Sequence, residues 1–335
     1  MAVELPNRAQ DGSPTVSVIV ITFARPTYVA QCLAHLARLR TRPAQVIVVD
    51  GSPDDDTAAV VTDMSDVDYV RHALGRGTMP ESRQLGLARA TGDVVAFIDD
   101  DAYVDPEWID ELVRPYADPE VVGVGGRAVN GIPGEDVEGL DEIGRLRPDG
   151  TLTGYFGADP HEVVDVDHLL GANMSFRRSA LQEIGGIRGN YPGTCLCEES
   201  DISLRLGLRG GRLVFAPAAV VRHVAAPYTT GGQRFDRRYL YYSRRNHVVL
   251  LARVFGWASP MLRRYARTAI VAQRSYLRVF WERATGAEGD GSTSSRLRAP
   301  IVLTRSVVEM VGLVAGVPAA WVARARDRRA GVRSP

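Results

Sequence analysis

The 335-residue chain contains no lysine, so its 40 fixed positive charges are all arginines. A guanidinium group binds phosphate and carboxylate through paired hydrogen bonds, which an ammonium group cannot form. Cysteine is also scarce. The three cysteines, Cys32, Cys195 and Cys197, form an odd set without the spacing of a disulfide framework, so we expect reduced thiols and a cytoplasmic protein. Cys195 and Cys197 could bind a metal, but without a second pair the favoured interpretation is two ordinary loop residues.

Long hydrophobic runs are missing as well. The uncharged stretch Met310–Ala323 has 14 residues and contains Pro318. A membrane-spanning helix needs about 20 apolar residues. The first fifteen residues are polar and lack the basic-then-apolar pattern of a signal peptide. We therefore expect neither a membrane span nor export.

A net charge of zero conceals a strong division along the chain. Residues 234–335 contain 20 arginines and 6 acidic residues, which leaves 40 − 20 = 20 arginines and 40 − 6 = 34 acidic residues in 1–233. The basic part also carries aromatic residues, including Tyr239, Trp257 and Trp281. Such a tail could bind an anionic membrane surface, or it could pack on the acidic part, including that of a second subunit in a homodimer. No motif for reading nucleic acid is present, so we expect no nucleic-acid partner.

Apolar runs alternate with amphipathic segments in the first hundred residues. The pattern predicts strands at 16–23, 45–49, 67–70 and 94–98, and helices at 28–39, 54–64 and 81–90. This alternation is typical of a doubly wound α/β fold, which binds ligands at the carboxyl ends of its strands. Further along we expect a strand at 169–176, helices at 178–184 and 198–209, and a strand at 212–216. The polar stretch 130–159 is either an insertion beside the site or an ordinary surface loop.

Three consecutive aspartates follow the predicted strand 94–98. Asp99, Asp100 and Asp101 cannot all ionise side by side without a cation to share. Their hard oxygen ligands suit Mg²⁺ or Mn²⁺. Asp99 and Asp101 point to the same side of an extended segment and could act together. For the three aspartates alone, a solvated acidic turn is the alternative interpretation.

Five segments together resemble the motifs of family-2 glycosyltransferases. In chain order they are Val20–Pro26, Val48–Thr57, Phe97–Asp101, Gly171–Arg178 and Glu198–Leu206. Each is weak alone, but together they follow the order of the family. The resemblance implies a GT-A fold, Rossmann-like with a mostly parallel sheet flanked by helices. It also implies transfer of a sugar from a UDP- or dTDP-sugar to an acceptor hydroxyl, with inversion at the anomeric carbon.

The resemblance further implies a donor site with a divalent cation. Asp101, with Asp99 beside it, would hold Mg²⁺ or Mn²⁺, which stabilises the charge on a leaving diphosphate. His223 is either a third metal ligand or a structural histidine. The remaining donor-site residues that the resemblance implies are Thr22, Phe23 and Arg25 around the nucleoside, Asp50 at the base, Ser52 at the adjoining turn, Asp100 at the ribose and Arg83 near the diphosphate.

Direct displacement also needs a general base for the acceptor hydroxyl. By resemblance this base is the second acid of a pair at a helix start, here Glu199, with Glu198 as the next candidate. Asp201 would bind the acceptor or support the helix start. For all three acids the alternative is compensation of the helix dipole. The acceptor-side loop is implied at Gly171, Ala172 and Asn173.

We expect three regions: a polar tail at 1–14, a GT-A domain at 15–232 and a helical basic region at 233–335. The acceptor would be a glycan or a lipid-linked precursor, used by an enzyme attached peripherally to the cytoplasmic face of a membrane. The sequence has two alternative interpretations. A nucleotidyltransferase of related fold is disfavoured because the chain has no lysine. A catalytically inactive sugar-nucleotide-binding or scaffolding protein is the alternative from another class.

Overall fold

The computed structural model describes residues 13–62, 64, 66–224, 236–285 and 293–331, without the side chains of 293–299. The predicted tail 1–14 lies almost wholly outside these residues, and so does the predicted boundary between 232 and 233. Those domain bounds therefore stay predictions. The chain divides into two compact units. The sheet unit comprises Met1–Leu146, Leu152–Gly189 and Glu198–Gly231, and the helical unit comprises Arg147–Thr151, Asn190–Cys197 and Gly232–Pro335.

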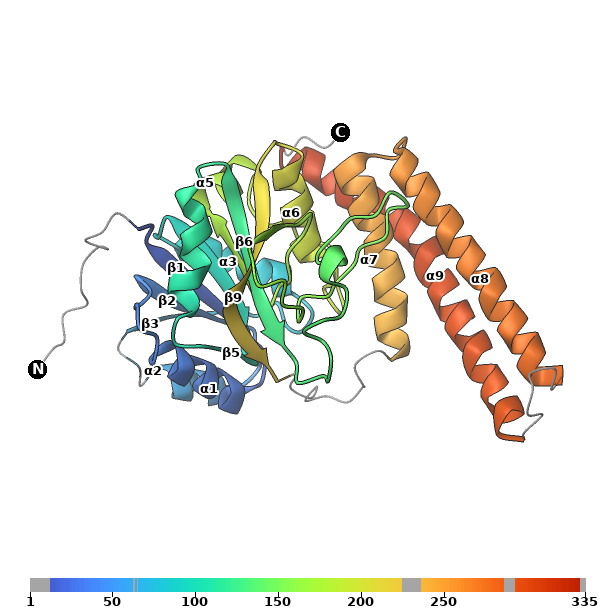
Figure 1. Ribbon diagram of the computed structural model, residues 1–335, viewed down its shortest axis with the longest axis horizontal. Helices are drawn as coiled ribbons and strands as arrows, with labels where there is room; N and C mark the ends of the chain where they lie inside the picture. The colour runs from blue at the N-terminus through green and yellow to red at the C-terminus, as the bar shows by residue number, and fades with distance from the viewer. Residues whose placement is uncertain (1–12, 63, 65, 225–235, 286–292, 332–335) are drawn as a thin grey trace, which may run out of the picture. The chain divides into compact units, whose positions relative to one another are not determined.

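The sheet unit is built on one nine-stranded sheet with helices packed on it (Figure 1). Its strands are β1 Val16–Thr22, β2 Gln45–Asp50, β3 Val67–Arg71, β4 Val94–Asp99, β5 Ala102–Val104, β6 Val121–Val129, β7 Val164–Asp165, β8 Asn173–Arg177 and β9 Arg212–His223. Its helices are α1 Pro26–Leu36, α2 Asp56–Thr62, α3 Met79–Arg89, α4 Trp108–Val113, α5 Arg178–Glu183 and α6 Glu198–Gly207, with short 3₁₀ turns at Arg114–Ala117 and Leu140–Glu142.

The strand order is β3-β2-β1-β4-β8-β6-β9-β5, and β7 pairs with β9. Strands β1 to β4 are mutually parallel, as the alternation of strand and helix predicts. Strand β8 runs antiparallel to both β4 and β6, which the sequence pattern did not reveal. Because β6 and β9 are again parallel, the carboxyl ends of β1, β2, β4, β6 and β9 all lie at one edge of the sheet.

Strand β1 is apolar along its whole length because the sheet is covered on both faces. All seven of its residues are buried. Val18 and Val20 belong to one hydrophobic core, whereas Ile19 belongs to a second core on the other face. Helix α3 lies close against this second face, since a Cβ on Gly86 would come within 2.6 Å of Ile19. Because a hydrophobic core covers each face of β1, the polar residues near this strand lie beyond its end.

Strand β9 is longer than the pattern predicts. We expected a strand at 212–216, but β9 continues to His223. The register with β6 jumps from Gly126↔Ala216 to Arg127↔Val220, so residues 217–219 form a bulge that accommodates Pro217. His223 is therefore the last residue of a strand and not, as expected, part of a loop beyond one. This extension carries His223 to the polar edge of the sheet.

The helical unit contains α7 Arg237–Phe255, α8 Pro260–Thr285 and α9 Thr293–Arg329. Helices α7 and α9 approach closely through glycines: a Cβ on Gly312 would lie 2.4 Å from the Tyr241 carbonyl oxygen, and one on Gly316 would lie 2.7 Å from Val248 Cβ. The helical region after residue 234 and its arginine content agree with expectation.

Buried ion pairs join α7 and α9. The Glu309 carboxylate of α9 is buried and accepts from Arg244 of α7 at 2.8 Å and from Arg305 at 2.9 Å. Farther along, Arg253 pairs with Asp327 at 2.6 Å. Because a buried carboxylate without a partner is strongly unfavourable, these pairs specify how α7 and α9 align.

Helix α9 differs from expectation in its length. We expected the 14-residue stretch Met310–Ala323 to be too short to span a membrane, but it lies inside one continuous helix. Among the described residues, Pro300–Arg329 is long and apolar enough to cross a membrane, by length and composition only, and a third of its most apolar window is buried within the protein. A core helix of a soluble protein can meet the same criteria, so this finding does not establish a span.

Candidate active site

Polar side chains gather where the parallel strands end. Thr22 ends β1, Asp50 ends β2, Asp99 ends β4 and His223 ends β9, while Asn130 directly follows β6. The topology thus brings together residues from five strands that are up to 200 positions apart in the chain. Ligands of α/β folds bind at this edge of the sheet.

Asp99, Asp101 and His223 form the centre of this edge. Each offers one ligand atom, and the three atoms lie within 4.8 Å of one another. Strand β5 pairs with β9 so that Ala102 lies opposite His223, which places the imidazole beside the preceding residue, Asp101. The His223 Nε2 atom is 3.4 Å from Asp101 Oδ1. Two carboxylates and one imidazole, with Asp101 and His223 buried, form a donor set that fits a divalent cation such as Mn²⁺.

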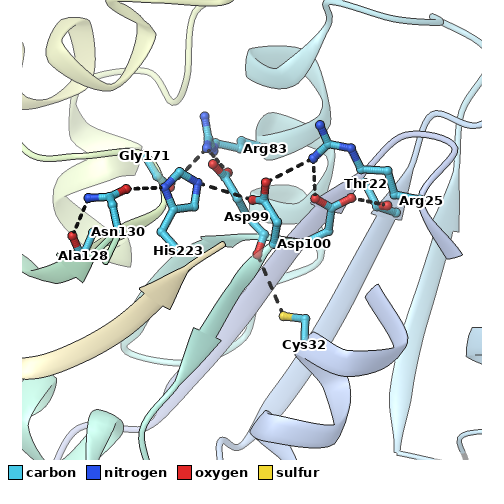
Figure 2. A network of polar contacts seen from close by, with 11 residues as sticks. Thr22, Arg25, Cys32, Arg83, Asp99, Asp100, Ala128, Asn130, Gly171 and His223 are labelled. Atoms are coloured by element: carbon cyan, nitrogen blue, oxygen red, sulfur yellow. Dashed lines mark hydrogen bonds and ion pairs between the residues drawn. The ribbon is translucent and has the colours of Figure 1, made fainter. Parts of the chain in front are cut away.

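Arg25 and Thr22 hold the middle aspartate of the run (Figure 2). The Thr22 hydroxyl donates to Asp100 Oδ2 at 2.7 Å, and Arg25 Nη1 donates to Asp100 Oδ1 at 3.0 Å. Arg25 also lies 3.4 Å from Asp101. Burial raises the pKa of Asp100 to about 7, although Arg25 opposes this shift. Both oxygens of Asp100, predicted at the ribose, are thus engaged within the protein, as are Thr22 and Arg25, predicted at the nucleoside.

A second arginine, Arg83, joins the aspartates to helix α6. Its buried guanidinium donates to Asp99 Oδ1 at 2.9 Å and to the Gly171 carbonyl at 3.1 Å, and it forms an ion pair with buried Glu198. A Cβ on Gly171 would lie 2.9 Å from Arg83 Nη2, so only glycine fits there without a shift. Arg83, predicted near the diphosphate, therefore bridges two carboxylates from distant parts of the chain.

Glu199 is the acid of the pair that Arg83 does not neutralise directly. It is half-buried in the first turn of α6. Burial raises the pKa of Glu199 to about 7, while the Arg83 charge acts in the opposite direction. A carboxyl group with such a pKa exchanges protons near neutral pH, as a general base must. Glu198 forms an ion pair with Arg83, whereas Glu199 does not, so the two candidate bases differ in their surroundings.

Asp201, two residues farther along α6, is buried and paired with arginines. Its Oδ1 accepts from Arg205 Nε at 2.6 Å and lies 3.9 Å from Arg188 Nε. Arg205 in turn donates to the Ile184 carbonyl at 2.8 Å. Of the two roles predicted for Asp201, this geometry is that of a support for the helix.

Asp50 is fully buried at the end of β2. Its Oδ1 accepts from the Ser52 amide at 2.8 Å and from the Ser52 hydroxyl, and its Oδ2 accepts from the Tyr69 hydroxyl at 2.7 Å. Ser52 Oγ also accepts from the Ala24 amide at 2.7 Å. The structure therefore shows Asp50 and Ser52, predicted to hold the nucleotide, bound to each other and to the β3 tyrosine.

Sequence reasoning missed His72, which lies beside the tight turn at Gly51. A Cβ on Gly51 would lie 2.9 Å from His72 Cε1 and 3.5 Å from Phe23 Cδ2. The His72 Nε2 atom is 2.8 Å from Ser82 Oγ. Burial lowers the pKa of His72. Phe23 and His72 thus border the same glycine, but no motif marked His72 because the residue follows β3 in a segment without a recognised pattern.

The predicted acceptor-side loop contains a core residue. Asn173 is fully buried, accepts from Trp108 Nε1 at 2.9 Å, and donates to the carbonyls of Ala219 at 2.9 Å and Arg127 at 3.1 Å. Ala172 is buried as well. The Asn173 side chain therefore joins strands and the β9 bulge, and within this loop the Gly171 carbonyl meets the charged network.

The three cysteines are buried, and none of them forms a disulfide bond. Cys32 Sγ lies 3.9 Å from the Asp99 carbonyl oxygen, and burial raises the pKa of its thiol. Cys197 lies 4.0 Å from His247 Nδ1 within the helical unit. Cys195 and Cys197 lie in the loop between α5 and α6, in agreement with the favoured interpretation as loop residues.

Comparisons with known proteins bear on this site. The curated glucosyl-dolichyl phosphate glucuronosyltransferase of Haloferax volcanii is 31% identical over 237 residues, which cover 64% of this chain and 71% of that protein. The pre-mycofactocin glycosyltransferase of Mycobacterium tuberculosis is 31% identical over 197 residues, covering 56% of this chain. This chain spans only 39% of the mycobacterial protein's length.

A solved structure shows the same fold. The mannosyltransferase PcManGT of Pyrobaculum calidifontis, in complex with GDP-Man and Mn²⁺, superposes with a TM-score of 0.59 at 18% identity, covering 95% of this chain and 89% of that one. The predicted GT-A fold is confirmed. The family model described as Glycosyl transferase family 2 matches residues 17–185, which is half of the chain. By this match and by the identity to the archaeal relative, the chain belongs to glycosyl transferase family 2.

Proposed function

We propose that this protein is a metal-dependent, inverting glycosyltransferase that moves a sugar from a UDP- or dTDP-sugar to a hydroxyl of a lipid-linked or glycan acceptor. The observation that carries the proposal is the cluster of Asp99, Asp101 and His223, whose ligand atoms lie within 4.8 Å of one another. Through Arg83 this cluster is joined to the start of α6, where Glu199 lies. This arrangement supports the proposal that a cation site and a base lie on one network.

Asp99, Asp101 and His223 would hold the cation. When bound, it stabilises the negative charge that builds on the leaving diphosphate. Because an imidazole belongs to the set, Mn²⁺ suits it better than Mg²⁺, which prefers oxygen ligands. The solved structural neighbour contains Mn²⁺. Arg25 and Arg83 add fixed positive charge on either side of the aspartates.

In the proposed reaction, Glu199 accepts the proton of the acceptor hydroxyl as that oxygen attacks the anomeric carbon of the donor. The new carbon–oxygen bond forms on the face opposite the breaking bond to the diphosphate, so the configuration inverts. The nucleoside diphosphate leaves with the bonding electron pair, and the proton stays on Glu199. Glu198, held by Arg83, and Asp201, held by Arg205, would fix the helix start that presents Glu199.

Exposed apolar residues of the helical unit support the proposal that the acceptor is bound to a membrane. On α9, one face carries Val307, Val311, Val314 and Trp321, all more than half exposed, and on α8 Trp281 is similarly exposed. Arg305 and Arg324 flank this stretch of α9 in the sequence, and Arg278 and Arg283 lie on either side of Trp281. An exposed apolar face with tryptophan and arginine suits the interface of an anionic membrane. The archaeal relative is named for a dolichyl phosphate substrate. We therefore propose peripheral attachment to the cytoplasmic face of a membrane.

Thermal unfolding with a panel of nucleoside diphosphates tests the donor site. UDP, dTDP and GDP, each with and without Mn²⁺, are added to the wild type and to Asp101→Ala. A ligand that binds only the folded state raises its stability by about 2.7 kcal/mol at a hundredfold excess over Kd. We expect a Mn²⁺-dependent increase with UDP or dTDP that Asp101→Ala abolishes. Asp141→Ala, at an exposed aspartate of the same unit, is the matched control and should behave as the wild type.

Two results would count against the proposal. An increase in stability with GDP alone would contradict a donor with a pyrimidine base but would still agree with a glycosyltransferase. No increase with any nucleotide would contradict the donor site as a whole.

A further inference from the structure

We propose that Asn130 is a positioning residue that fixes the tautomer of His223 and thereby turns the unprotonated Nε2 of the imidazole toward Asp99 and Asp101. The inference rests on the proposed metal dependence and assigns a function to a residue that no motif marked. Asn130 begins the polar stretch whose role the sequence left open.

The sheet brings the two residues side by side. Asn130 directly follows β6, and Val129, the last residue of β6, is in register with Arg222 of the parallel strand β9. The next residues, Asn130 and His223, therefore extend from adjacent strands in the same direction. Asn130 Oδ1 lies 3.2 Å from His223 Nδ1 (Figure 2). The contact spans 93 positions of the chain and depends on the bulge that lengthens β9.

Hydrogen bonds on the other side of the amide decide which of its atoms faces the histidine. Asn130 Nδ2 donates to the Ala128 carbonyl at 2.9 Å and to Glu135 Oε2 at 3.2 Å. Both partners are acceptors, so the amide nitrogen must lie on their side. The oxygen, which can only accept, is then directed at His223. It follows that His223 Nδ1 carries a hydrogen and donates to Asn130.

With Nδ1 protonated, the neutral imidazole has its lone pair on Nε2. This atom lies 3.4 Å from Asp101 Oδ1, which is also an acceptor. Two acceptors that face each other at this distance repel unless a cation or a proton lies between them. A histidine whose far nitrogen donates to a neighbour is the arrangement that proteins use to orient a metal ligand. Asn130 therefore prepares His223 to share a cation with the aspartates.

Glu135 holds Asn130 in place although the asparagine lies at the surface. Glu135 Oε1 accepts from the backbone amides of Asn130 and Gly131, both at 2.9 Å, and from that of Ile132 at 3.3 Å. The tight loop that results needs left-handed backbone at Gly131, where φ is 75°, and at Gly134, where φ is 81°. The two glycines thus allow the loop that holds the Asn130 side-chain amide beside His223.

Nitrogen-15 NMR of histidine in the metal-free protein tests the tautomer directly. The chain has six histidines, so the spectrum of His223→Ala identifies the signal of His223. In the wild type at alkaline pH we expect a protonated Nδ1 and a lone pair on Nε2. Asn130→Leu should convert His223 to the other tautomer or to a mixture.

Direct Mn²⁺ titration, followed by calorimetry or by the electron paramagnetic resonance of free Mn²⁺, provides the second measurement. We expect Asn130→Leu to weaken Mn²⁺ binding about 10- to 100-fold. Ile132→Ala changes an exposed residue of the same loop and is the matched control, with no expected loss.

The two measurements separate this inference from the proposed function. A wild-type tautomer with the hydrogen on Nε2, or full Mn²⁺ affinity in Asn130→Leu, would overturn the role of Asn130. Failure of the wild type to bind Mn²⁺ would instead overturn the proposed metal dependence, and the NMR result would still decide whether Asn130 sets the tautomer of His223.

Discussion

In the sheet unit every residue of β1 is buried, whereas on α9 of the helical unit Val314 is 65% exposed and Trp321 is 63% exposed. Both elements are rich in apolar residues, so composition alone does not distinguish them. The sheet buries its apolar residues between two layers of helices and leaves polar groups for the strand ends. The helical unit leaves an apolar face outward, and an exposed face of this kind marks an interaction surface.

The charged residues of the two units differ in a related way. In the sheet unit, Arg25 and Arg83 are drawn into one network with the aspartates at the carboxyl edge. In the helical unit, Arg244 and Arg253 form separate ion pairs that align helices. This contrast suggests that the chemistry and the attachment of the protein reside in different units. The predictions below test that division, from the largest expected effect to the smallest.

Removal of the candidate base should have the largest effect. We expect Glu199→Gln to lower kcat by about 10²- to 10⁴-fold, because proton removal from the acceptor hydroxyl contributes about that much. Donor binding, measured by the thermal panel, should remain. Glu183→Gln, at an exposed glutamate of α5, is the matched control. Activity that survives Glu199→Gln would assign the base elsewhere, and a wild type that binds donor without any transfer would favour the inactive scaffold.

The pH profile of the wild type should report the same group. Burial raises the pKa of Glu199 to about 7, with Arg83 lowering it and Asp99 raising it. Since a base acts only as the carboxylate, kcat/KM should rise with pH up to about 7 and then level off. Below that pH, the rate should fall about tenfold per unit. A profile that is flat from pH 5 to 8 would contradict Glu199 as the base.

Charged residues introduced on the apolar face of α9 should weaken attachment to a membrane without changing nucleotide binding. We expect the double substitution Val314→Asp and Trp321→Asp to reduce binding to anionic vesicles at low salt by tenfold or more, since about 1.4 kcal/mol of interfacial binding is a tenfold effect. Vesicle flotation provides the measurement. Nucleotide binding by the sheet unit should be unchanged. Asp substitution at exposed Leu208, in the sheet unit, is the control. Equal flotation of all variants would refute the membrane surface.

Overpacking between α7 and α9 should have the smallest effect on activity. Gly316→Leu introduces a side chain where a Cβ would already lie 2.7 Å from Val248 Cβ. We expect it to destabilise the helical unit by about 1–3 kcal/mol, visible as a lower unfolding temperature. Val314→Leu, an exposed position on the same helix, should have little effect. If Gly316→Leu also abolished nucleotide binding, the two units would not be separable in function.

Much of the fold could be predicted because the signals are local. The first four strands and three helices lie within a few residues of their predicted positions, since apolar periodicity and turn residues act over short distances. The antiparallel direction of β8 and the continuation of β9 past Pro217 could not be predicted. Both depend on pairing with strands far away in the chain, and the β9 bulge depends on the room that Gly126 leaves, where a Cβ would lie 2.1 Å from the Ala219 carbonyl.

The acids of the site illustrate the same limit. The sequence placed Asp99 and Asp101 at a strand end and an acidic pair at a helix start. It did not indicate that Glu198 is neutralised by Arg83 and Glu199 is not, because Arg83 lies more than 100 positions away from them. Nor did it indicate that Asn173 uses its side chain within the core, and for Asp201 it left open a choice between binding the acceptor and supporting the helix start. Burial and ion pairing are properties of neighbours in space.

The sequence by itself determined the alternation of strands and helices, the acidic run after β4 and the division of charge, because each is a property of adjacent residues. Only the tertiary structure decided which of these groups act together. It set the imidazole of His223 beside Asp101 and directed the Asn130 amide to that imidazole. It also left an apolar face of α9 uncovered. The physical reason is that hydrogen bonding, desolvation and charge pairing act over a few ångströms in space, whereas His223 and Asp101 are 122 positions apart along the chain.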